Sequence, residues 1–154
     1  MGQEIERKFL VRGDAWKTLG AGTRMRQGYL STDPERVVRV RVEGDAATIT
    51  IKGRSVGATR GEWEYPIPLS DAEEMLAQLC LRPLVEKIRY RIMQHDMLWE
   101  VDEFLGDNAG LVVAEIELTA EEQAFVKPEW VADEVTNDAR YYNANLLRHP
   151  YSAW

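Results

Sequence analysis

Cysteine is almost absent from this sequence, and so are long hydrophobic runs. The single cysteine, Cys80, lies in the apolar segment 75–81, where a small core residue is its expected role, and no intrachain disulfide can form. The chain has no run of ~18 apolar residues, and it does not open on a basic segment followed by an apolar one. We therefore expect a cytoplasmic protein that neither spans a membrane nor is secreted.

Basic charge and histidine are also scarce. The chain has 19 Lys and Arg against 26 Asp and Glu, a net charge of -7, which argues against duplex nucleic acid or an anionic membrane as a partner. The two histidines, His95 and His149, are expected in a hairpin turn and in the tail 148–154, so neither is a predicted metal ligand. Walker A and G-x-G-x-x-G loops are absent, and nucleotide binding through such loops is not indicated.

Short segments that alternate apolar and polar residues dominate the chain. Gly, Asp, Asn and Pro separate them about every ten residues, which is typical of antiparallel β structure. With 154 residues and no repeat or linker, a single domain over 1–154 is expected. The fold class is mainly β, as a sandwich or a closed barrel, with predicted strands at 3–11, 24–31, 36–43, 47–53, 61–68, 84–94, 97–104 and 111–118.

A few helices are expected around this sheet. The run 70–73 matches a capping box ahead of an apolar helical pattern that reaches Leu81. The run 119–122 matches a second capping box and predicts a helix that ends before Pro128. A third helix is expected over 138–147, where it could close one end of a barrel.

The polar faces of the strands are unusually ionic. Glu4, Glu6 and Lys8 follow one another at period two, so in a strand they share one face while Ile5 and Phe9 lie on the other. The alternation recurs along the chain and segregates carboxylates from cations. The carboxylates are Glu4, Glu6, Glu62, Glu64, Glu100, Asp102, Glu115 and Glu117, and the cations are Lys8, Arg39, Arg41, Lys52, Lys87 and Arg89.

Two architectures could carry these faces. In a sandwich they would point to water, whereas in an eight-stranded closed barrel they would line an interior that can hold one small ligand. Like charges two residues apart on one face repel, which implies something between them that neutralises both. Metal ions would satisfy the carboxylates and an anion would satisfy the cations, so the pattern favours the ligand-filled barrel.

The ordered series resembles the CYTH superfamily, the triphosphate tunnel metalloenzymes, in its short bacterial branch. It begins with the Glu-x-Glu-x-Lys motif of Glu4, and the pairs described above follow in order over essentially the whole chain. The resemblance implies an eight-stranded antiparallel closed β-barrel, a tunnel with a few peripheral helices. A linear triphosphate would lie against Arg and Lys there, while two Mg²⁺ or Mn²⁺ ions sit on acidic residues.

Roles follow from residue chemistry and from this resemblance. Guanidinium forks and lysines bind phosphate oxygens, and hard divalent cations prefer carboxylates. The resemblance implies that Lys87 and Tyr29 act together in catalysis, although packing is the more usual role of an aromatic residue in a strand, and Glu4 or another carboxylate could accept a proton from water. The predicted substrate ligands are Lys8, Arg39, Arg41, Lys52, Lys87 and Arg89, and the predicted metal ligands are Glu4, Glu6, Glu62, Glu64, Asp102, Glu115 and Glu117.

Metal-dependent hydrolysis of inorganic triphosphate to pyrophosphate and phosphate is the function that this pattern favours. The alternatives are a class IV-type adenylyl cyclase, a thiamine or nucleoside triphosphatase, and a non-catalytic polyphosphate-binding module. The expected partner is a small polyphosphate rather than nucleic acid or membrane, and a homodimer stays open. Three further arginines, Arg24, Arg26 and Arg91, could line the tunnel mouth or face water.

Overall fold

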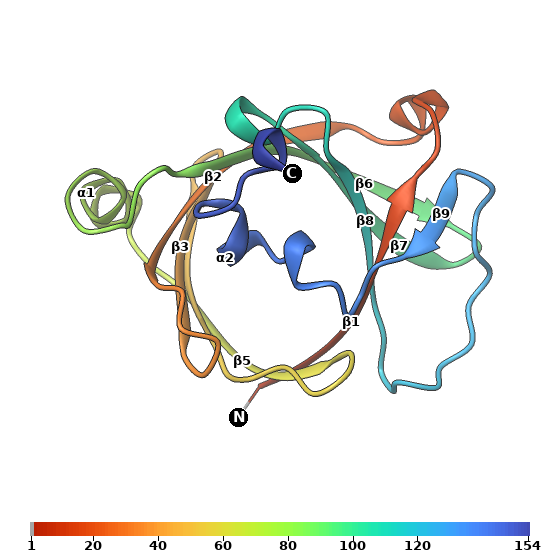
Figure 1. The fold of residues 1–154 in the computed structure, drawn as a ribbon, viewed down its shortest axis with the longest axis horizontal. Helices are drawn as coiled ribbons and strands as arrows, with labels where there is room; N and C mark the ends of the chain where they lie inside the picture. The colour runs from red at the N-terminus through yellow and green to blue at the C-terminus, as the bar shows by residue number, and fades with distance from the viewer. Residues whose placement is uncertain (1) are drawn as a thin grey trace.

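A computed structural model describes residues 2–154 as a closed antiparallel barrel with one additional strand. Hydrogen-bonded neighbours follow the order β5-β4-β3-β2-β6-β7-β8-β1-β9, and β5 also pairs with β1, which closes eight strands into a ring (Figure 1). The strands are β1 (Gln3–Val11), β2 (Gly22–Ser31), β3 (Val37–Glu43), β4 (Ala46–Lys52), β5 (Thr59–Pro66), β6 (Val85–Gln94), β7 (Met97–Phe104), β8 (Val112–Glu117) and β9 (Val131–Glu134). The closed eight-stranded barrel predicted from the sequence is confirmed.

The β1–β5 junction that closes the ring is short. It holds three residue pairs, Gln3 with Gly61, Glu4 with Arg60 and Ile5 with Thr59. By comparison, β6 and β7 are joined by eight pairs that run from Lys87 with Phe104 to Gln94 with Met97. The other junctions of the ring hold five to eight pairs, so the β1–β5 junction has the fewest.

Apolar packing lies mainly outside the ring. Val40 and Val42 of β3 point outward and are buried by Ala72 and Leu76 of α1 (Leu69–Gln78). On the opposite side, Phe9 packs edge-on against Trp99 with ring centroids 5.7 Å apart, within a second outer cluster. Because the outward residues of the strands are covered, their inward residues are free to be polar.

The third apolar cluster lies inside the ring, at one end. Tyr29, Val85 and Phe104 point inward there and pack against Leu146 and Leu147 of the C-terminal segment. In Figure 1 that segment, drawn in blue, lies across the middle of the ring. One end of the barrel is therefore an ordinary apolar core, and the charged part of the interior lies beyond it.

Two of the three predicted helices are present in altered form. The helix expected at 70–81 is α1, which begins one residue earlier and has no side-chain cap. The helix expected over 138–147 is divided into η3 (Ala139–Tyr141) and α2 (Asn143–Leu146), because Tyr142 between them is extended at φ -71° and ψ 127°. Three further short helices are η1 (Ala15–Leu19), η2 (Gly106–Asn108) and η4 (Tyr151–Ala153), the last within the expected tail.

The helix predicted from Thr119 to Pro128 is wrong, since the segment consists of turns and extended chain. Thr119 donates through its backbone N–H and its hydroxyl to Gln123 Oε1, at 2.6 and 2.9 Å, so the expected cap contacts are replaced. Phe125 then packs edge-on against Phe9 and Trp99, at 6.1 and 5.7 Å between ring centroids. Tertiary packing of one aromatic ring outweighs a weak local helix preference.

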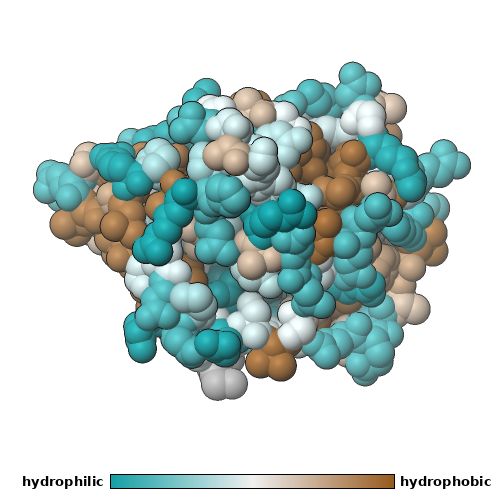
Figure 2. Space-filling view, viewed as in Figure 1, coloured by the Kyte–Doolittle hydropathy of each residue, from teal (hydrophilic) through white to brown (hydrophobic). Residues whose placement is uncertain are grey.

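The outside of the molecule is largely hydrophilic. Seen from the same direction as in Figure 1, polar side chains cover most of the face, and apolar ones show both on the side of α1 and on the opposite side (Figure 2). Leu79 and Leu81, which follow that helix, are among the exposed apolar residues. None of the helices formed by residues 2–154 is both long and apolar enough to cross a membrane.

Candidate functional site

A charged cavity of about 610 Å³ occupies the barrel interior. All the predicted site residues line it except Asp102, and Arg91 lines it as well. Arg24 and Arg26 instead pair outside with Glu86 and Glu73, at 2.9 and 2.6 Å. The lining cations are Lys8, Arg39, Arg41, Lys52, Arg54, Arg60, Lys87, Arg89 and Arg91, and the lining carboxylates are Glu4, Glu6, Glu43, Glu62, Glu64, Glu100, Glu115 and Glu117.

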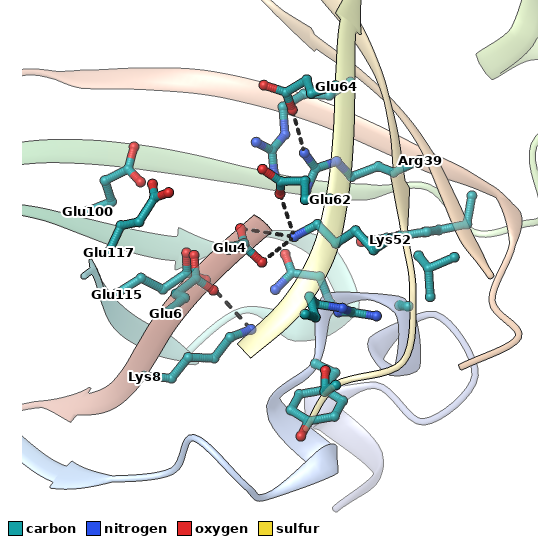
Figure 3. A pocket seen from close by; sticks show the side chains of 18 of the residues that line it. Glu4, Glu6, Lys8, Arg39, Lys52, Glu62, Glu64, Glu100, Glu115 and Glu117 are labelled. Atoms are coloured by element: carbon teal, nitrogen blue, oxygen red, sulfur yellow. Dashed lines mark hydrogen bonds and ion pairs between the residues drawn. The ribbon is translucent and has the colours of Figure 1, made fainter. Parts of the chain in front are cut away.

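Carboxylates face one another across β1, β8 and β7. The register places Glu6 opposite Glu117, and Glu100 opposite Glu115. Figure 3 shows these four side chains on the same side of the cavity. Like charges directly opposite each other on adjacent strands are destabilising. Within residues 2–154, cations pair with Glu100 and Glu115 but not with Glu6 and Glu117, so the imbalance lies at the latter two.

The pKa values within this acidic group reflect that imbalance. Burial, and then the charges of Glu115 and Glu4, raise the pKa of Glu6 well above its usual value. Burial, Glu4 and Glu100 likewise raise the pKa of Glu117. Glu115 differs, because Lys8 and Arg89 outweigh its burial and lower its pKa to about 2. Its partner Lys8 lies 3.6 Å away, measured from Nζ to Oε1.

Lys52 links two carboxylates across the β1–β5 junction. Its Nζ lies 3.1 Å from Glu4 Oε1 and 3.3 Å from Glu62 Oε2 (Figure 3). One ammonium cannot neutralise both, and burial together with Glu4 raises the pKa of Glu62 to about 7. Burial works in the same direction on Glu4, but Lys52 outweighs it and the pKa of Glu4 is lowered. Glu4 is therefore the more fully ionised member of the pair at neutral pH.

Asp102 is enclosed by cations rather than by other carboxylates. Its Oδ2 accepts from Lys87 Nζ at 2.7 Å and from an Arg89 terminal nitrogen at 2.8 Å, and its Oδ1 accepts from Arg89 Nε at 2.7 Å. Both side chains of the Lys87–Asp102 pair are 1% exposed. Burial would raise the pKa of Asp102, but the two cations overcome it and lower that pKa strongly. Asp102 thus supports two predicted substrate ligands from behind the cavity wall.

Lys87 is a buried amine with an altered pKa. Burial, opposed by Asp102 and reinforced by Arg89 and Arg41, lowers the pKa of Lys87 to about 7. Besides Asp102, its Nζ donates to Asn143 Oδ1 at 2.8 Å. Tyr29 lines the same cavity, but its hydroxyl accepts from Gln27, and among residues 2–154 no hydrogen bond joins it to Lys87.

Arg39, which is buried, and Arg41, which is half-buried, have few partners inside the barrel. A terminal nitrogen of Arg39 donates to Thr50 at 3.0 Å and lies 3.3 Å from Glu64 Oε1, whereas its buried Nε finds no hydrogen-bond partner in the part of the chain that the structure describes. Within residues 2–154, Arg41 forms no salt bridge, and its Nε donates to the neutral oxygen of Gln27 at 3.0 Å. Burial, and then Arg39 and Arg89, lower the pKa of Arg41 to about 9, so it is charged at neutral pH. These guanidinium groups can accept an anion.

Several interior residues were not predicted to have a role. Arg60 and Glu43 share inward parity with predicted residues of β5 and β3, so period two alone could have identified them. Gln27 shares inward parity with Tyr29 on β2, but neither Gln27 nor Asn143 carries a charge, and neither was predicted to have a role. They are nevertheless joined to each other at 3.0 Å, and through Arg41 and Lys87 to the predicted set.

The acidic group fits a divalent metal that is shared with a ligand. Among residues 2–154, no three Asp, Glu, His or Cys side chains by themselves enclose a metal ion. Mg²⁺ does not need such a cage, since it keeps several waters and is usually bound by one or two carboxylates plus substrate phosphates. The opposed Glu6, Glu117, Glu100 and Glu115 offer hard oxygen donors, and within residues 2–154 Glu6 and Glu117 have no salt-bridge partner.

Comparison with known proteins agrees with this chemistry. The chain is 52% identical over 151 residues to an inorganic triphosphatase of Acetivibrio thermocellus, covering 98% of this chain and 97% of that protein. An inorganic triphosphatase of Nitrosomonas europaea is 39% identical over 147 residues, with 93% and 95% coverage.

Comparison with solved structures agrees with these sequence matches. The crystal structure of an inorganic triphosphatase matches with a TM-score of 0.67 and 36% identity, over 96% of this chain and 95% of its own. The family model described as the CYTH domain matches residues 2–151. The resemblance predicted from the ordered charged pairs is therefore confirmed, and the chain belongs to the CYTH domain family.

Proposed function

We propose that this protein hydrolyses inorganic triphosphate to pyrophosphate and phosphate inside the barrel, with a divalent metal. The observation that carries the proposal is that the interior holds both a cation and carboxylates whose charges are not neutralised by the described part of the protein. Among residues 2–154, Arg41 is a half-buried cation without a carboxylate partner, and Glu6 and Glu117 are opposed carboxylates that no salt bridge neutralises. A metal–triphosphate complex supplies both missing charges. The identity of 52% with a named inorganic triphosphatase supports the same conclusion.

Glu6, Glu115 and Glu117 would hold Mg²⁺ or Mn²⁺, with Glu4 and Glu62 close enough to take part in a second site. A bound divalent ion supplies Lewis acidity to phosphoryl oxygens and acidifies a coordinated water. We do not place Glu64 and Asp102 among the metal ligands, because both already bind other side chains of the protein. Glu64 accepts from Thr50 at 2.6 Å, and Asp102 is occupied by Lys87 and Arg89.

The chain's own cations would hold the substrate. Arg39 and Arg41 present planar guanidinium groups that suit phosphate oxygens, while Lys8 and Lys52 provide point charges on the acidic side. Fixed cations stabilise the charge that spreads over phosphoryl oxygens in the transition state. Glu4, ionised beside Lys52, is a candidate acceptor for the proton of an attacking water.

Lys87 would contribute at the reacting phosphoryl group. Its ammonium is held by Asp102 and Asn143, and a pKa of about 7 lets it keep or release a proton near neutrality. Tyr29 lies in the same cavity wall, so the predicted pairing of these two residues remains part of the proposal.

Substrate choice separates this function from its alternatives. With Mg²⁺ or Mn²⁺, we expect phosphate release from tripolyphosphate, with much slower release from ATP or thiamine triphosphate. The measurement is a phosphate assay run beside a cyclic AMP assay on the same samples. Cyclic AMP formation would support the cyclase instead, and tight tripolyphosphate binding without phosphate release would support a binding module.

Arg41→Gln is expected to weaken substrate use without unfolding the protein. Hydrogen bonds to charged groups are worth about 1.5–3 kcal/mol, which corresponds to a KM for tripolyphosphate raised about 10- to 100-fold. Because Arg39 and Arg89 repel Arg41, the variant should be no less stable than the parent. Steady-state kinetics and thermal melting test both parts, and an unchanged KM would remove Arg41 from the substrate site.

A further inference from the structure

The C-terminal segment reaches residues of the proposed active site. Leu146 and Leu147 anchor α2 in the apolar end of the barrel, and Asn143, the first residue of that helix, lines the charged cavity. Tyr142 lies there too, with Lys8 Nζ 5.6 Å from the centre of its ring. Residues far from Lys8 and Lys87 in the sequence therefore contact both lysines.

Asn143 has a specific set of partners. Its Oδ1 accepts from Lys87 Nζ at 2.8 Å and from Gln27 Nε2 at 3.0 Å. Both donors are buried, with Lys87 1% and Gln27 0% exposed. One amide oxygen thus joins two strands, β6 and β2, to the C-terminal segment.

Gln27 extends this contact to a second proposed substrate ligand. Its Nε2 also donates to the Tyr29 hydroxyl at 3.1 Å, and its Oε1 accepts from Arg41 Nε at 3.0 Å. Since both ends of the amide are engaged, Gln27 has one orientation that satisfies all of its partners. The chain of contacts therefore runs from Arg41 through Gln27 and Asn143 to Lys87.

We propose that Asn143 is a positioning residue that holds Lys87, and through Gln27 also Arg41, in the geometry needed for triphosphate hydrolysis. The inference rests on the proposed function. Without Asn143, Lys87 Nζ keeps Asp102 as its hydrogen-bonding partner, so the amine is drawn toward Asp102 and Arg89 and away from the cavity. The C-terminal segment thereby completes the site as well as closing the apolar end of the barrel.

A purely structural role makes a different prediction. The Asn143 side chain does not cap α2, and its two hydrogen bonds go to residues outside the segment. Asn145 in the same helix also lines the cavity, but it is the useful contrast, because its Nδ2 donates to the backbone of Ala139 at 2.8 Å, within the segment, and among residues 2–154 its side chain has no hydrogen bond to Lys87 or Gln27. Leucine at position 143 would fill similar volume without an acceptor, whereas aspartate would keep the acceptor.

The experiment compares Asn143→Leu, Asn143→Asp and Asn145→Ala by tripolyphosphate kinetics and thermal melting. Misplacing a catalytic group by ~1 Å can cost about 100-fold, so we expect kcat of the leucine variant to fall about 10- to 100-fold. Its KM should change less than kcat, because Arg41 keeps its own hydrogen bond to Gln27 Oε1 and the other phosphate-binding cations are not held by Asn143. The aspartate variant should recover most of kcat, with a raised KM from its added charge. Asn145→Ala should keep the parental kcat even where its melting temperature falls.

The outcomes separate this inference from the proposed function. If the unaltered protein does not hydrolyse tripolyphosphate, the proposed function fails. If it does, and Asn143→Leu retains kcat within about twofold, Asn143 has no positioning role. Equal losses of kcat in Asn143→Leu and Asn145→Ala, each matched by a fall in melting temperature, would also overturn the inference, since segment stability would explain both.

Discussion

Glu6→Gln is expected to abolish tripolyphosphate hydrolysis while leaving the fold at least as stable as before. An amide is a weaker ligand for a hard divalent ion, and loss of metal-assisted catalysis should cost about 100-fold or more in kcat/KM. Stability should move the other way, because Glu6 faces Glu117 and is repelled by Glu115 and Glu4. Removing one of two opposed like charges on adjacent strands is worth ~0.2–1 kcal/mol. Urea denaturation in EDTA and phosphate release measure the two effects.

Glu122→Gln is the matched control for this charge change. Glu122 is exposed in the turn after β8, and the same substitution there should alter neither activity nor stability. A Glu6→Gln protein with normal turnover would remove Glu6 from the metal site. A stable but inactive Glu6→Gln protein would separate function from folding at a single carboxylate.

Asp102→Asn is expected to give the largest loss of stability of any single substitution considered for the interior. Its carboxylate accepts from Lys87 and Arg89, and all three groups are buried. Removing one partner of a buried ion pair typically costs about 3–5 kcal/mol, because the remaining charges are left uncompensated. Urea denaturation in EDTA should therefore show a much lower midpoint than for the parent protein.

The same measurement decides between two roles for Asp102. The sequence predicts it as a metal ligand, whereas its contacts make it the counterion of two cations. A metal ligand would lose activity with little change in metal-free stability, as expected for Glu6. If Asp102→Asn is fully stable in EDTA and inactive, the metal-ligand role is correct and the counterion role is wrong.

Strand periodicity could reveal which side chains point inward. Glu6 and Glu117 lie on different strands far apart in the sequence, yet period two places each on the polar face, and both line the cavity. The valines of β3 and the isoleucines of β4 alternate with polar residues, so they are predicted to lie on the outer face. Taken together, the ionic faces of the strands favour a closed barrel, because a ligand in its interior could neutralise them.

Which interior side chains contact each other depends on the register between neighbouring strands, and the period-two pattern of a single strand does not predict that register. Arg89 lies directly opposite Asp102, and only that alignment shows that the carboxylate is occupied by cations. The amides Gln27 and Asn143 lacked a charge pattern, and Asn143 reaches Lys87 only because α2 enters the barrel. These contacts are properties of tertiary structure alone.

The segment after β8 shows the limit of local signals. Its capping pattern suggested a helix, but Phe125 is more favourably buried against Phe9 and Trp99. The strand β9, four residues from Val131 to Glu134, was missed because so short a run has little periodicity of its own. It exists through pairing with Phe9 and Val11 of β1.

The short β1–β5 junction links ligand binding to the stability of the closed ring. With three residue pairs, it is the place where the ring can separate at the smallest cost in backbone hydrogen bonds. Glu4 lies on one side of it and Glu62 on the other, with Lys52 bridging them. A triphosphate complex that engages Lys52 together with Glu4 would act as a cross-link between the two edges. Occupancy of the interior would then suppress opening of the ring, so that the ligand becomes part of what keeps the barrel closed.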